Sequence, residues 1–96
     1  MSGFTRPIRF LLGTVTITPT ATEALIRTET DVTQLLRRHQ SGDFGKIPFD
    51  DKQVNEKAIQ TGSRILSSSP LKAGTVIWVI TSSGWQQSHV LIREEY

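Results

Sequence analysis

The sequence contains no cysteine, and it has only two histidines, His39 and His89. The first absence excludes disulfides, thiolate nucleophiles and metal sites with cysteine ligands. The two histidines do not form a His-x-x-x-His pair, which makes a zinc site a poor fit as well. We therefore predict no metal and no cofactor. A cytoplasmic location fits a cysteine-free chain best, although such a chain can also be secreted.

Long apolar runs are also missing near the N-terminus. Between Met1 and Gly13 the apolar stretch is only Phe10, Leu11 and Leu12, which is far shorter than a signal-peptide core or a membrane span. We expect neither export nor membrane insertion.

Acidic residues are scarce in both flanking parts of the chain. None precedes Glu23 and none lies between Lys57 and Arg93, whereas seven of the nine fall between Glu23 and Glu56. The formal net charge of +2 is too small to predict nucleic-acid binding by itself. The middle of the chain is thus acidic and its flanks are basic.

The 96 residues, 36% of them hydrophobic, suit one folded domain with a single core, which we assign to residues 1–96. Alternating apolar and threonine residues predict a strand over Gly13–Thr18, ended by Pro19. Near the C-terminus the same criteria predict a three-stranded meander. Its strands are Arg64–Ser68, Thr75–Thr81 and Ser88–Arg93, and the middle one is apolar on both faces.

Three helices are predicted between these strands. A capping box at Thr20–Glu23 starts the first, which ends near Arg27. A start signal at Thr30 and Asp31 precedes the second, which Gly42 stops. Asp50 with Gln53 starts the third, whose apolar stripe carries Val54, Ala58 and Ile59. The predicted fold is therefore α+β: an antiparallel sheet of about four strands with about three helices packed on one face. The place of the first strand in the sheet stays open.

An ordered loop should connect the second and third helices, because Ser41–Pro48 is rich in glycine, aspartate and proline. We expect Phe44 and Ile47 to point inward, Asp43 to close an Asx-turn, and Asn55 to brace the loop from the third helix.

No catalytic motif is present, and we predict no catalytic residue. The sequence has neither a nucleophile elbow nor the partners that a kinase signature requires beside Asp43-Phe44-Gly45. His39 and His89 are expected to be structural. The acids Asp43, Asp50, Asp51 and Glu56 are interleaved with lysines and are better explained as a solvated face than as a cation site. An enzyme would need Asp43, His39 and Arg64 to converge in a deep pocket.

Trp85 lies in a predicted turn, where core packing is least expected. Either it is a recognition residue or it folds back over the sheet edge. As a candidate binding surface we take the residues that the turn, the loop and the basic strand would present, namely Trp85, Gln86, Gln87, Asp43, Lys46 and Arg64.

Several spaced segments resemble a known family. They are Arg38-His39 followed by Gly42–Gly45, then Asn55, Gly62 with Arg64–Ser67, and Val76–Thr81. Their order is similar to that of small uncharacterised proteins of bacterial plasmids, phages and other mobile elements. The resemblance implies a cytoplasmic accessory domain, for which the family offers no established activity.

We rank three functions. The first is a non-catalytic domain that binds another protein, because catalytic groups are missing while Trp85 and the loop offer surface that a partner could contact. The second is nucleic-acid binding, as an accessory to DNA modification or restriction, through a basic sheet that carries Arg64, Lys72 and Arg93, although an ordinary polar sheet face explains these residues more simply. A small enzyme comes last. The oligomeric state is open.

Overall fold

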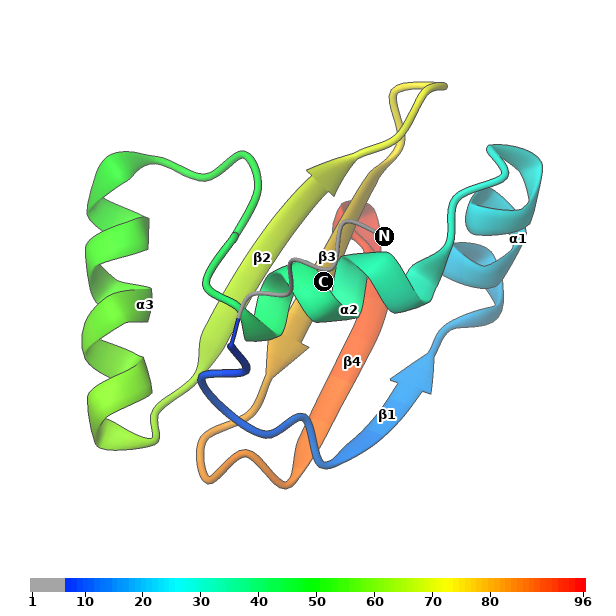
Figure 1. The fold of residues 1–96 in the computed structure, drawn as a ribbon. Helices are drawn as coiled ribbons and strands as arrows, with labels where there is room; N and C mark the ends of the chain where they lie inside the picture. Colours follow the sequence, from blue (N-terminus) through cyan, green and yellow to red (C-terminus); the bar gives the residue numbers. More distant parts are fainter. Residues whose placement is uncertain (1–6) are drawn as a thin grey trace.

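Four strands and three α-helices make up the described part of the fold, residues 7–96, so the predicted α+β class is confirmed (Figure 1). The structure, a computed structural model, describes residues 7–96, and the start of the segment examined for a leader, residues 1–6, lies outside this range. In chain order the elements are β1 (Thr14–Ile17), α1 (Pro19–Arg27), α2 (Val32–Gln40), α3 (Phe49–Thr61), β2 (Ile65–Pro70), β3 (Val76–Thr81), β4 (Gln87–Ile92) and the 3-10 turn η1 (Arg93–Glu95). Among the described residues no helix has both the length and the apolar character needed to cross a membrane.

The sheet has the strand order β1-β4-β3-β2. Strands β2, β3 and β4 form the predicted antiparallel meander. The first strand joins β4, and it does so in parallel, with Thr16 opposite His89. The prediction of a wholly antiparallel sheet was therefore wrong for β1. Residue periodicity marks a strand but not its direction, which depends here on the helices that carry the chain away from β1.

The hydrophobic core lies on one face of the sheet, which we call the covered face. Helices α1 and α2 pack there and bury Ala21, Leu25 and Leu35 against Ile77, Val79 and Val90. Helix α3 lies beside β2, along the sheet margin (Figure 1). A second cluster joins it to the N-terminal segment and the loop through Phe10, Phe44, Ala58 and Ile65. The prediction that all three helices pack on one face of the sheet was thus only roughly right, because α3 extends past the edge of the sheet.

Two helices start elsewhere than the sequence suggested. Thr18, not Thr20, caps α1: its hydroxyl accepts a 3.1 Å hydrogen bond from the Ala21 N–H. Pro19 occupies the first helical turn, where its missing N–H costs nothing and its fixed φ suits a helix. The predicted cap at Asp31 is confirmed, since its carboxylate accepts a 2.9 Å hydrogen bond from the Thr33 N–H.

Helix α3 begins at Phe49 after Pro48, one residue before the predicted cap at Asp50. Its apolar stripe also differs from the prediction, because Val54 is 63% exposed whereas Asn55 is buried beside Ala58. A polar residue on the packed face is unusual, and its partner explains it.

The backbone N–H and carbonyl of Leu66, on the outer edge of β2, both form hydrogen bonds with the Asn55 side chain. Its amide donates a 2.8 Å hydrogen bond to the Leu66 carbonyl and accepts a 3.2 Å one from the Leu66 N–H. Asn55 therefore braces the edge strand and not the loop, contrary to the prediction. An edge strand with satisfied backbone groups offers no template for a further strand.

The loop before α3 covers the next stretch of the same edge. Ser68 donates its N–H to the Phe44 carbonyl and accepts from the Lys46 N–H, at 3.0 and 2.8 Å. Such close pairing requires Gly45, because a Cβ there would lie 2.0 Å from the Ser68 carbonyl oxygen. The predicted inward side chains are confirmed: Phe44 is buried and Ile47 packs against the second cluster.

Candidate functional site

His39, near the end of α2, lies within a buried chain of polar side chains. The ring is 0% exposed. Its Nδ1 is hydrogen-bonded with Ser67 Oγ of β2, and its Nε2 lies 2.9 Å from Thr81 Oγ1 of β3. Thr81 Oγ1 is 2.7 Å from Ser88 Oγ of β4, and Ser88 donates a 2.7 Å hydrogen bond to the Leu12 carbonyl. The chain joins α2 to three strands and to the N-terminal segment.

The carbonyl at the end of this chain fixes the direction of every hydrogen bond in it. Because a carbonyl only accepts, Ser88 gives its one proton to Leu12 and must accept from the Thr81 hydroxyl. Thr81 in turn accepts from the Nε2–H of His39. The neutral imidazole then accepts at Nδ1 from the Ser67 hydroxyl.

Burial lowers the pKa of His39 from 6.5 to about 4, because the enclosed site disfavours the imidazolium. The ring is therefore neutral at pH 7, as the hydrogen-bond directions require. It also packs edge-on against Phe10, with 5.0 Å between ring centroids. Since Ser67 is only 2% exposed, neither member of the pair reaches the surface, and their contacts hold α2 on the sheet.

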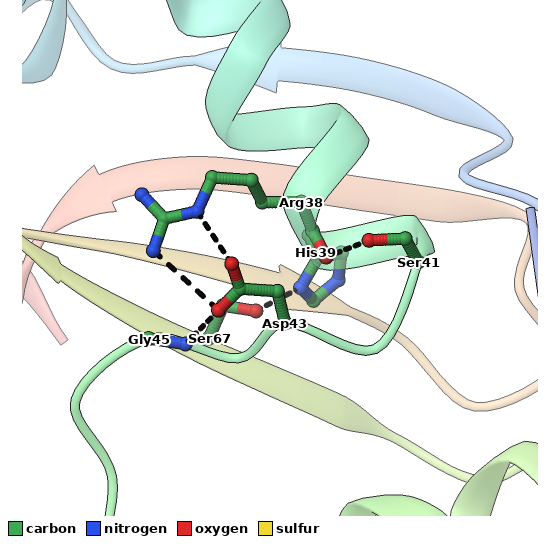
Figure 2. A network of polar contacts seen from close by, with 6 residues as sticks. All are labelled: Arg38, His39, Ser41, Asp43, Gly45 and Ser67. Atoms are coloured by element: carbon green, nitrogen blue, oxygen red, sulfur yellow. Dashed lines mark hydrogen bonds and ion pairs between the residues drawn. The ribbon is translucent and has the colours of Figure 1, made fainter. Parts of the chain in front are cut away.

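Asp43 lies in the loop after α2 and makes polar contacts close to His39 (Figure 2). Arg38 Nε donates a 2.9 Å hydrogen bond to one carboxylate oxygen, and the Gly45 N–H donates a 3.3 Å one to the other. The second contact is the predicted Asx-turn. Figure 2 shows the His39 ring engaged with Ser67 while Asp43 faces Arg38, so the two residues serve different partners.

Trp85 folds back onto the protein. Its indole N–H donates a 3.1 Å hydrogen bond to the Ser63 carbonyl, and its ring lies 5.5 Å from that of Phe10. The residue has a positive φ of 56°, an uncommon conformation outside glycine that this packing stabilises. Of the two interpretations left open by the sequence, folding back over the sheet edge matches these contacts.

The other candidate surface residues are spread over the molecule. Gln86 and Gln87 lie exposed where the turn meets β4, and the exposed Lys46 lies in the loop beside β2 with Asp43. Arg64 precedes β2, and its side chain reaches neither Asp43 nor His39 but donates a 2.9 Å hydrogen bond to the Tyr96 hydroxyl.

That contact lies on the second face of the sheet, which we call the open face because the core residues of α1 and α2 pack on the other one. Side chains alternate along each strand, so Trp78 points away from the core residues Ile77 and Val79. The red C-terminal turn η1 lies on the opposite side of the sheet from α2 (Figure 1). It brings Tyr96 to Trp78, with ring centroids 5.4 Å apart and planes at 56°.

We call Trp78, Tyr96 and Arg64 the aromatic platform. Tyr96 is 71% exposed and Trp78 is half-buried, so ring surface is available to a ligand. The Arg64 guanidinium carbon lies 5.9 Å from the Tyr96 ring centroid. A cation and two aromatic rings thus share one surface.

No strand of the sheet carries a carboxylate. The acids nearest in sequence to the platform are Glu94 and Glu95 in η1. Glu94 pairs with Arg93 at 3.3 Å. Glu95 accepts from the Ile92 N–H and the Thr18 hydroxyl, and the first of these hydrogen bonds is the main cause of its lowered pKa. Both carboxylates are engaged, whereas Arg64 has no carboxylate partner among residues 7–96.

The platform was not identified from the sequence as a site. Thr75–Thr81 gave the available signal, because a strand that is apolar on both faces needs something to cover each face. The three predicted helices cover one face. The other face is contacted by a C-terminal turn, whose path no local sequence pattern predicts.

Within the described range no three His, Asp or Glu side chains gather as metal ligands would. Comparison with known proteins adds no relative: no family model, no curated protein and no solved structure matches the chain. The resemblance to mobile-element proteins therefore stays a prediction, and function has to be argued from the geometry.

Proposed function

We propose that the protein binds single-stranded nucleic acid on the open face of its sheet. The observation that supports this most directly is the Trp78–Tyr96 ring pair, 5.4 Å apart, beside the guanidinium of Arg64, which has no carboxylate partner among residues 7–96. Unstacked bases bind to such surfaces because every base has an apolar π-face, and each stack contributes about 1 to 3 kcal/mol. A base pair inside a duplex keeps that face hidden.

The surroundings of the platform suit a polyanion. The strands present threonine, serine, histidine and glutamine on the open face, including Thr16, Ser68, His89 and Gln87, and they carry no carboxylate. Hydroxyl and amide groups donate to phosphate and sugar oxygens without sequence preference. We therefore expect weak sequence selectivity.

The surfaces that first suggested a protein partner are engaged within the fold. Trp85 packs on Phe10, and the loop around Gly45 covers the edge of β2. Neither is a free anchor of the kind that forms a protein hot spot. For this reason nucleic-acid binding takes precedence here over a protein partner, and a ligand of this class would be met in the cytoplasm.

Fluorescence anisotropy with labelled eight-nucleotide RNA and DNA at low salt tests the proposal. Wild type should bind single strands and leave a duplex of the same sequence largely unbound. Tyr96→Ala removes an exposed ring and should weaken binding about tenfold, on the scale of one lost stack. Tyr96→Phe keeps the ring and should retain most of the affinity.

The matched control for Arg64→Gln is Arg37→Gln, because Arg37 is an exposed arginine of α2, which packs on the covered face. Only the first variant should weaken binding. Absence of binding at tens of micromolar protein would refute the proposal, as would equal binding by Tyr96→Ala or a preference for duplex.

A further inference from the structure

A groove of about 620 Å³ runs between α3 and the start of β2. Val54, Ala58 and Leu66 contribute its apolar walls, and Lys57 and Arg64 contribute its cations. Arg64 also binds the Tyr96 hydroxyl, so it belongs to both the groove and the aromatic platform. The two surfaces are therefore continuous.

We infer that this groove holds the nucleotide next to those stacked on the platform, with its base between the apolar walls and its phosphate at Lys57 and Arg64. The inference rests on the proposed function and assigns the path of the strand. A pocket of several hundred cubic ångströms is large enough for one nucleotide. Val54 of α3 is 63% exposed, and a base stacked on it would remove that apolar surface from water.

The charges in the groove favour an anionic occupant. Lys57 and Arg64 have no carboxylate partner among residues 7–96, whereas Arg9 and Arg38 are paired with Glu56 and Asp43. One acid, Asp51, lines the groove as well. With Lys57, Arg64 and Asp51 counted together, the groove has a net charge of one positive unit, and the Asp51 carboxylate should repel a phosphate at close range.

Asp51 supplies a test that a folding defect cannot imitate, because the expected result is a gain. Asp51→Asn should tighten binding of an eight-nucleotide single strand roughly threefold, the scale of one solvent-exposed charge pair. Asp50→Asn is the matched control, since it removes the same charge from the same first turn of α3 but outside the groove. It should change the affinity much less.

Lys57→Gln should weaken binding of the same probe several-fold, and its control Lys52→Gln, on the same helix outside the groove, should not. The salt dependence gives a second measure. One phosphate neutralised by Lys57 and Arg64 predicts a contribution of about −0.7 to the slope of the logarithm of affinity against the logarithm of salt, and Lys57→Gln should reduce this contribution. A two-nucleotide probe, long enough only for the platform, should be insensitive to Lys57.

The outcomes separate the two proposals. If Tyr96→Ala weakens binding as expected while the Asp51 and Lys57 variants behave like their controls, the groove is not occupied and the inference is overturned alone. If no single-stranded probe binds wild type, the proposed function fails and the path of the strand fails with it.

Discussion

Mild acid should destabilise this protein through one buried side chain, His39. Its pKa falls from 6.5 to about 4 on burial, so the unfolded chain binds a proton in a pH range where the folded chain does not. Stability from the neutral ring is fully present above pH 6.5 and is lost as the pH falls through about 4. A depression of this size corresponds to about 3 kcal/mol of unfolding free energy. Within the window the slope approaches about 1.4 kcal/mol per pH unit, as expected for one proton.

Urea unfolding at several pH values between 7.5 and 4.5 measures this slope. His39→Gln keeps a polar side chain but cannot titrate, so its unfolding free energy should vary less with pH than that of wild type. At pH 7 the variant should be less stable by about 1 to 3 kcal/mol, because the enclosed Ser67 and Thr81 hydroxyls lose well-placed partners. His89→Gln retains the buried ring and serves as the control.

Two carboxylates add their own pH dependence at the acidic end of this window. The pKa of Glu56 is lowered chiefly by its hydrogen bonds from Arg9, and that of Glu95 by the Ile92 N–H, so the stability that each supplies is lost only as the pH falls through its lowered pKa. Should wild type and His39→Gln lose stability in parallel between pH 6.5 and 4.5, the proton is taken up elsewhere. The description of His39 as an enclosed neutral donor and acceptor would then be incorrect.

Three further substitutions probe the edge and the first helix, each by urea unfolding at pH 7. Gly45→Ala combines a positive φ with a backbone clash and should cost more than about 3 kcal/mol, whereas Gly74→Ala has a positive φ in open space and should cost about 1; equal costs would argue against the close pairing of loop and strand. Asn55→Ala should cost about 1 to 3 kcal/mol, since it leaves both polar groups of Leu66 without a partner; a neutral result would contradict its role at the edge. Thr18→Ala removes the cap of α1 and should cost about 1 kcal/mol, and an unchanged midpoint would show that Pro19 alone starts the helix.

Local sequence patterns predicted the helices and strands of this fold well, but they did not predict which of these elements lie side by side. The alternation in β1 and the meander, and the cap at Asp31, depend on residues close in sequence, which a single chain displays directly. The pairing of β1 with β4 joins residues more than seventy positions apart, and nothing near Thr14 encodes it. The same limit explains why Asn55 was assigned to the wrong partner.

The candidate site shows the same division. Arg64 was predicted from the sequence as a binding residue and belongs to the platform. Tyr96 also belongs to the platform but was not predicted, because its position depends on the turn that folds it back onto Trp78. Trp85 was chosen because turns normally expose their side chains. Its packing depends on Phe10, which lies far away in the chain and is brought near only by the second cluster.

The parallel pairing of the first and last strands also orders events during folding. Thr14 through Ile17 can make no ladder hydrogen bonds until Gln87 through Val90 are in place, so β1 has to wait for the last strand even though it is the first to be synthesised. Closing so long a loop is entropically costly and slows this pairing. During that interval β4 has a bare outer side, and transient intermolecular pairing would start there.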